Sequence, residues 1–191
     1  VLVSSNGGFT MNGGEITGNI ASSYGGGVFV SSGSSFTMNG GEITKNNVSS
    51  DGEGGGVCVY VLSYSSTKSK ITVSGDAKIT GNWKNDTEAN NVYLGGTSTK
   101  TAATITIGEG LTEQAQIGVN KSSTDLEKGT VFKIATGATG TMDYTKIFTS
   151  DVSDKYFITR DSEGSLYLGM HQHSLTYVAG ADGKTITAIC E

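Results

Sequence analysis

Residues 9–30 read FTMNGGEITGNIASSYGGGVFV, and residues 36–59 repeat them as FTMNGGEITKNNVSSDGEGGGVCV. The nonapeptide FTMNGGEIT returns unchanged after 27 residues, and the pattern GGGV-x-V returns after 29 residues. Repetition at such a period indicates one supersecondary unit stacked on copies of itself. We therefore expect the two copies to lie directly over each other as successive turns of a solenoid.

Each copy holds three short runs in which apolar and polar residues alternate, at 9–11, 15–17 and 28–30 in the first copy. Alternation with period two predicts β-strands. Glycines at 13–14 and 25–27 separate the runs, and glycine permits sharp bends. Three strands joined by bends make one coil, and parallel strands of neighbouring coils pair about 4.8 Å apart. The sequence thus predicts an all-β fold, a right-handed parallel β-helix with a C-terminal β cap.

The alternation also predicts which side chains face the core, because a slip by one residue would expose every apolar side chain. The inward set is Phe9, Met11, Ile16, Val28 and Val30, followed in the second copy by Phe36, Met38, Ile43, Val57 and Val59. The outward set is Thr10, Glu15, Thr17 and Phe29, followed by Thr37, Glu42, Thr44 and Cys58. Cys58 is therefore expected to be a free thiol on a strand surface, and a disulfide with Cys190 is the alternative.

Two further turns are more divergent. Residues 71–82 match the repeat with one extra residue near Asp76, and residues 91–94 then replace the pattern GGGV-x-V. A fourth turn begins at 103–108 and continues to 116–119. The segments 60–70 and 95–101 are rich in Ser, Thr and Lys and are predicted to be loops at coil corners.

Three regions follow from this pattern: β-helix turns at 1–120, a cap at 121–169 and the start of a following β-rich module at 170–191. In the cap we expect strands at 130–135, 155–160 and 165–168, and a short helical turn at 143–148. An Asp-Gly turn at 182–183 predicts a hairpin. Residues 1–8 align with 28–35, so we expect a piece of a longer solenoid, a monomer whose open first coil can stack end to end.

Composition excludes several partner classes. The net charge is −5, with a single arginine, Arg160, and no basic stripe, which argues against nucleic acid and anionic membranes. No apolar run approaches the roughly 18 residues of a membrane span, so no membrane insertion is expected. Two cysteines give no disulfide framework.

Stacking places equivalent residues of neighbouring turns side by side. The structural ladders expected are an asparagine stack of Asn19, Asn46 and Asn82 and threonine files of Thr17, Thr44 and Thr80 and of Thr10, Thr37, Thr72 and Thr106. Such ladders hold flat stacked sheets together. Ice binding by threonine files is disfavoured, because the turns vary in length and carry Glu beside Thr.

Catalytic and metal sites have weak support. Glu15, Glu42 and Asp76 offer too few oxygens for Ca²⁺, which takes six to eight, and a glycosidase needs carboxylates at a defined separation. No catalytic residue and no cofactor is predicted. His171, His173 and Cys190 are weak candidates for metal ligands. The exposed aromatics are candidates for stacking on sugars: Tyr24, Phe29, Trp83 and Tyr93.

At FTMNGGEITGN followed by GGGVFV, the chain resembles the right-handed β-helix repeats of large bacterial surface proteins, with pectate-lyase-like architecture. It is similar to the Gly-Gly-containing repeats of chlamydial polymorphic outer-membrane proteins, and residues 90–94, 105–107 and 117–119 look like solenoid ends in secreted proteins of Gram-positive gut anaerobes. The resemblance implies an extracellular, cell-wall-attached adhesin or rigid stalk, non-catalytic, with a host or microbial glycan or protein as ligand. The alternative is a carbohydrate-active enzyme or glycan-binding domain of the pectate-lyase-like type.

Overall fold

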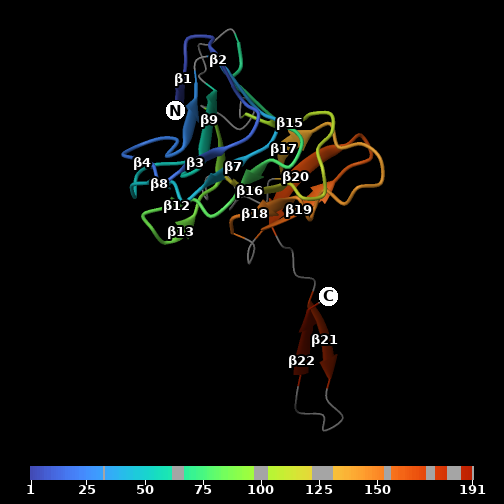
Figure 1. Ribbon diagram of the computed structural model, residues 1–191. Coiled ribbons are helices and arrows are strands. Elements are labelled where there is room, and N and C mark those ends of the chain that lie inside the picture. The colour runs from blue at the N-terminus through green and yellow to red at the C-terminus, as the bar shows by residue number, and fades with distance from the viewer. Residues whose placement is uncertain are drawn as a thin grey trace.

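The computed structural model describes residues 1–31, 33–61, 67–96, 103–121, 131–152, 156–170, 175–179 and 186–190, and these form strands and turns with no helix. Figure 1 shows short strands wound into a solenoid. The described part of the chain accordingly holds no helix long and apolar enough to cross a membrane. The all-β solenoid of parallel sheets is confirmed, while the handedness of its winding stays a prediction.

The largest sheet has nine strands in the order β1-β5-β9-β14-β16-β11-β7-β3, with β18 also paired to β16. The central strand β16 lies beside both β11 and β14, so it joins two half-sheets that are separate in the earlier coils. The strands are β1 (Leu2–Val3), β3 (Glu15–Thr17), β5 (Val28–Val30), β7 (Glu42–Thr44), β9 (Val57–Val61), β11 (Lys78–Ile79), β14 (Val92–Gly96), β16 (Gln116–Asn120) and β18 (Phe148–Ser150).

A second sheet has seven strands in the order β19-β20-β17-β15-β10-β6-β2. Its pairs are parallel from β2 to β17 and antiparallel from β17 through β20 to β19. The strands are β2 (Gly8–Met11), β6 (Ser35–Met38), β10 (Lys70–Val73), β15 (Ile105–Ile107), β17 (Phe132–Thr136), β19 (Tyr156–Arg160) and β20 (Ser165–Met170).

Each of the first three coils has a fourth strand that the alternation did not reveal. These strands form a sheet in the order β13-β12-β8-β4. They are only two residues long, too short for a period-two pattern, and lie between the second and third runs of each repeat. Their bounds are β4 (Ile20–Ala21), β8 (Asn47–Val48), β12 (Trp83–Lys84) and β13 (Glu88–Ala89).

The predicted register is confirmed. Phe9 pairs with Phe36 in parallel strands, and Ile16 pairs with Ile43. The divergent turns follow the same alignment, because Phe36 pairs with Ile71 and Ile71 with Ile105. The two identical nonapeptides therefore occupy successive rungs.

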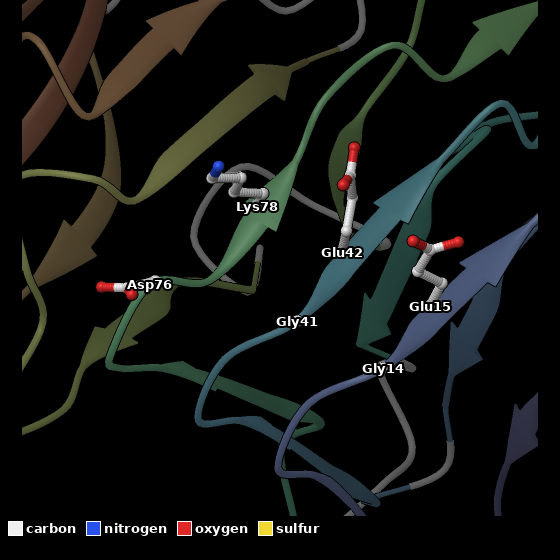
Figure 2. Close-up of a pocket in the computed structure, with 6 residues that line it drawn as sticks. All are labelled: Gly14, Glu15, Gly41, Glu42, Asp76 and Lys78. Atoms are coloured by element: carbon white, nitrogen blue, oxygen red, sulfur yellow. The ribbon is translucent and has the colours of Figure 1, made fainter.

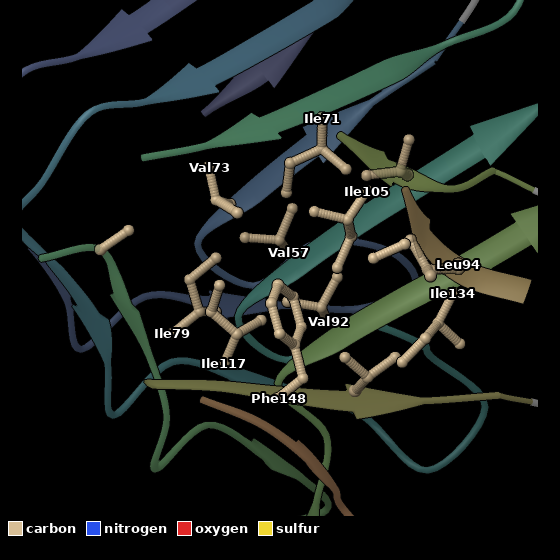
Figure 3. Close-up of a cluster of buried hydrophobic side chains, with 14 of the residues drawn as sticks. Val57, Ile71, Val73, Ile79, Val92, Leu94, Ile105, Ile117, Ile134 and Phe148 are labelled. Atoms are coloured by element: carbon tan, nitrogen blue, oxygen red, sulfur yellow. The ribbon is translucent and has the colours of Figure 1, made fainter. Parts of the chain in front are cut away.

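The core lies between the facing sheets. In Figure 3, Ile71 and Ile105 of the seven-stranded sheet share one cluster with Val57, Ile117 and Phe148 of the nine-stranded sheet. The inward residues of the second copy are fully buried, whereas Phe9 and Ile16 of the first copy are half-buried and pack against the cluster. The rings of Phe9 and Phe36 stack at 5.4 Å.

Strands β17, β19 and β20 confirm the expected strands beyond the repeats, and Phe132, Ile134 and Leu168 belong to the core. The short helical turn expected at 143–148 is present as a single hydrogen-bonded turn, in which Ile147 N and Phe148 N both donate to Tyr144 O. It does not continue into a helix, because strand β18 begins at the fully buried Phe148. The hairpin is confirmed as the antiparallel pair β21 (Leu175–Ala179) and β22 (Ile186–Cys190), a two-stranded sheet of its own.

Candidate functional site

The asparagine stack is present and longer than expected. Asn19 donates from its backbone N and from Nδ2 to Oδ1 of Asn46, and Asn46 donates in the same way to Asn82. Asn82 then donates to Oδ1 of Asn91, which donates to the carboxylate of Asp151. We call this series of five residues the asparagine ladder. Asp151 escaped sequence analysis because it lies outside the repeats, and Asn91 because it stands at a position that is glycine in the first two copies.

The threonine files are also present. Thr17 pairs with Thr44, and Thr80 follows Ile79, the partner of Ile43. The second file is confirmed and gains a fifth member, since Thr106 pairs with Thr136. Its full membership is Thr10, Thr37, Thr72, Thr106 and Thr136.

Aromatic side chains gather on the outer face of the nine-stranded sheet. The rings of Tyr24 and Phe29 stack with centroids 5.3 Å apart, and the ring of Tyr60 lies 5.8 Å from that of Tyr24. Tyr60 pairs with Gly95, and a Cβ at Gly95 would fall within 3 Å of the rings of both Tyr60 and Tyr93. We name Tyr24, Phe29, Tyr60 and Tyr93 the aromatic platform.

Three of the four predicted ligand-binding aromatics thus share one face, and Trp83 does not. Trp83 lies on β12 of the four-stranded sheet and is 40% exposed, compared with 43% for Tyr24. Phe29 and Tyr93 are half-buried rather than exposed. Tyr60 was missed because its segment was assigned to a loop, although the alternation after Val57 and Val59 continues through it to the end of β9.

The expected surface exposure of Cys58 is wrong. Cys58 occupies an outward position between Phe29 and Tyr93, yet its side chain is fully buried as a free thiol. The bend before β9 covers it, because a Cβ at Gly54 would lie within 3 Å of the Cys58 backbone and Cβ. Burial raises the pKa of the Cys58 thiol, and the charge of Glu53 raises it further.

One ion pair borders the platform. Glu53 accepts from Lys84 Nζ at 2.9 Å through one oxygen and from Asn90 Nδ2 at 3.1 Å through the other. Glu53 also forms a parallel bridge with Tyr24, so the pair lies close to the platform. The charges of Glu53 and Lys84 cancel, which leaves this border electrically neutral.

A shallow hollow of about 310 Å³ lies over β3, β7 and β11 and is lined by Gly14, Glu15, Gly41, Glu42, Asp76 and Lys78. We name it the carboxylate groove. Figure 2 shows Glu15 and Glu42 side by side on neighbouring strands, with their carboxylates on the same side of the sheet. Lys78 follows Glu42 in the same file, and Asp76 accepts a hydrogen bond from the hydroxyl of Thr112.

The groove is open to solvent. Glu15 and Asp76 are exposed, and the described residues give none of the three carboxylates an ion-pair partner. Within the described part of the chain, no three His, Cys, Asp or Glu side chains are placed to hold a metal ion. His171 and His173 lie outside the described residues, and for Cys190 only the backbone of β22 is described.

Comparison of the chain with protein-family models, with curated proteins and with solved structures found no match.

Proposed function

We propose that this chain is a non-catalytic segment of an extracellular, cell-wall-attached bacterial surface protein, in which a rigid solenoid presents an adhesive face. The observation that carries the proposal is the aromatic platform, where the ring of Tyr24 contacts those of Phe29 and Tyr60 and the ring of Tyr93 lies close to Tyr60. Solenoids offer extended surfaces for such contacts because every coil packs on its neighbours. The pectate-lyase-like, Gram-positive origin that the sequence resemblance implies is part of the same proposal.

The ligand that fits the platform is a neutral saccharide. Two of its rings belong to Tyr24 and Tyr60, and each combines an apolar ring with a hydroxyl that needs a hydrogen-bond partner when buried. A wholly apolar partner would leave these hydroxyls without partners, at a cost. A sugar supplies C–H groups for the rings and hydroxyls for the phenols. The neutral border and the net charge of −5 disfavour an acidic glycan.

The test is a glycan array followed by titration calorimetry on the full chain. We expect Tyr60→Ala to weaken binding of an array hit about tenfold, because one aromatic contact is lost. Trp83→Ala is the control, an aromatic residue away from the platform that is about as exposed as Tyr24. If no saccharide binds, or if both variants lose affinity equally, the adhesive face is contradicted and the role of a rigid spacer is favoured. Antibody labelling of intact source cells tests the surface location.

The second candidate is a carbohydrate-active enzyme, and the observation in its favour is the adjacent pair Glu15 and Glu42 in the groove. Neighbouring strands lie about 4.8 Å apart, near the roughly 5 Å carboxyl separation of retaining glycosidases. Release of reducing sugar that is abolished by Glu42→Gln and retained in Tyr60→Ala would favour this enzyme over the adhesin.

A further inference from the structure

The repeated nonapeptide carries a reactive dipeptide. Asn-Gly pairs occur at 6–7, 12–13 and 39–40, and the last two belong to the two identical copies of FTMNGGEIT. Asparagine is a thermolabile residue, and a following glycine has no Cβ to hinder its backbone N from approaching the side-chain amide carbon. Because the two copies share one local sequence, any difference in reactivity between Asn12 and Asn39 must come from the fold.

The fold encloses the pair at 39–40 and leaves the pair at 12–13 open. Gly40 is buried, whereas Gly13 is exposed. A Cβ at Gly75 of the next coil would lie within 3 Å of Asn39 O, while a Cβ at Gly13 would meet nothing within 4 Å. Solvent therefore reaches the backbone of the first pair and is kept from that of the second.

The two side-chain amides differ in the same direction. Asn39 donates from Nδ2 to Oδ1 of Asn12 at 2.8 Å and accepts from Ser74 Oγ at 2.9 Å, so both ends of its amide are held. Asn12 accepts that one bond, and among the described residues its Nδ2 has no hydrogen-bond acceptor. Rotation of the Asn12 amide breaks one hydrogen bond, and rotation of the Asn39 amide breaks two.

The remaining pair, at 6–7, differs at its backbone nitrogen. Gly7 N donates to Ser4 O at 3.0 Å and to Ser34 Oγ at 3.1 Å. Gly13 N donates to no acceptor in the part of the chain that the structure describes, because it lies in the bend between β2 and β3. Only Gly13 thus combines a glycine nitrogen without a hydrogen bond with exposure to solvent.

We propose that Asn12-Gly13 is a site of spontaneous deamidation, at which the exposed bend is converted through a succinimide to aspartate or isoaspartate. Gly13 N attacks Asn12 Cγ. The bond between these two atoms forms, the bond between Cγ and Nδ2 breaks, and the proton of Gly13 N leaves with the amide as ammonia. Water then opens the ring. Cleavage at Cγ gives aspartate, and cleavage at the backbone carbonyl carbon of residue 12 gives isoaspartate.

The products differ in their effect on the first coil. Both add a negative charge two residues before Gly14, which lines the carboxylate groove. An aspartate keeps an oxygen that can accept from Asn39 Nδ2. An isoaspartate carries the main chain through the former side chain, so it lengthens the connection between β2 and β3.

The test is incubation of the full chain in mildly alkaline buffer, followed by digestion with a Glu-specific protease and tandem mass spectrometry. Cleavage after Glu15 and Glu42 separates Asn12, in peptide 1–15, from Asn39, in peptide 16–42. In the folded chain we expect Asn12 to be converted about tenfold or more faster than Asn39, because the enclosed pair reacts only after local opening. In denaturant the two rates should become equal.

Equal rates at Asn12 and Asn39 in the folded chain, or faster conversion at Asn39, would overturn the proposal. Fragment ions of peptide 1–15 distinguish Asn12 from Asn6, and conversion mainly at Asn6 would overturn it as well. These readouts use the unmodified chain and do not depend on the folding of any variant.

A matched pair of variants tests the assignment by ion-exchange chromatography. Asn12→Gln retains an amide but lengthens the side chain, which makes ring closure slower, so the early acidic form should disappear. Asn39→Gln changes the same position of the other copy and should retain that form. An acidic form that accumulates at an unchanged rate in Asn12→Gln would contradict the proposed site.

Discussion

Asn46 illustrates how single side chains hold the coils together. Its side chain is fully buried and donates to Ile16 O, Thr44 O and Asn82 Oδ1 while accepting two hydrogen bonds from Asn19. Three successive coils meet at this one amide. A buried polar group without a hydrogen-bond partner lowers the stability of the folded state. The ladder therefore allows these corners of the coils to be buried.

We predict that Asn46→Ala lowers the free energy of unfolding by about 3 kcal/mol, because it leaves buried partners unsatisfied on both sides. Asn19→Ala, at the exposed end of the same ladder, should cost about 1 kcal/mol, because water can replace the lost partner. Urea denaturation of both variants checks the difference. Equal losses would show that burial of the amide does not determine its contribution.

Cys58 gives a second prediction at this scale. In a Cys190→Ser background, the thiol should react with iodoacetamide at pH 8 far more slowly in the native chain than in denaturant. The reason is twofold: burial denies the reagent access, and the raised pKa keeps the thiol protonated. Rapid native-state alkylation, followed by mass spectrometry, would contradict the fully buried position.

Single residues show which structural properties the sequence predicts and which it does not. Alternation correctly orients Val57 and Val59, because strand geometry alone fixes the face. It orients Cys58 outward as well, but it cannot reveal that the bend at Gly54 covers that position. The alternation therefore predicts the face on which a strand residue lies, while burial on the outer face depends on how the preceding bend folds over it.

At the scale of elements, the glycine triplets are places where neighbouring coils approach each other closely. A Cβ at Gly55 would lie within 3 Å of backbone atoms of Trp83 and Asn90, which cannot move independently of β12 and the following coil. Gly110 differs, with φ of +75° and open space around it. Gly55 is required because a side chain there would clash with the neighbouring coil, and Gly110 because its backbone is in the left-handed region.

We predict that Gly55→Ala destabilises the chain by about 3 kcal/mol or more, since the added methyl group forces two coils apart. Gly110→Ala should cost only about 1 kcal/mol, the strain of a left-handed backbone with a side chain. Thermal unfolding followed by circular dichroism distinguishes the two. A larger loss of stability in Gly110→Ala than in Gly55→Ala would contradict the prediction that the steric contact at Gly55 matters more than the backbone conformation at Gly110.

The elements were predictable where the repeat is long enough to show a period. The runs at 9–11, 15–17 and 28–30 became strands with the expected partners. The two-residue strands β4, β8 and β12 lie below that limit, and the extension of β9 to Val61 depends on its pairing with β14. The aromatic platform could be predicted in part for the same reason, because Tyr60 lies on that extension.

For the whole molecule, the folding kinetics follow from topology and composition. Most strands pair with a strand of the next coil, as Phe9 does with Phe36, so folding must close long loops before it gains contacts. The chain contains no proline, so no slow prolyl isomerisation accompanies this search. We predict refolding in milliseconds to seconds or slower, with amplitudes independent of the time spent unfolded in double-jump experiments. An additional slow phase that grows with unfolding time would contradict the prediction.

The coils do not share one length. Phe36 is the partner of Phe9, Ile71 the partner of Phe36 and Ile105 the partner of Ile71, so successive steps are 27, 35 and 34 residues (36 − 9, 71 − 36 and 105 − 71). The interior nevertheless keeps one alignment throughout, because the surplus residues fall between strands. A change in the length of an outer segment is therefore compatible with an unaltered hydrophobic interior.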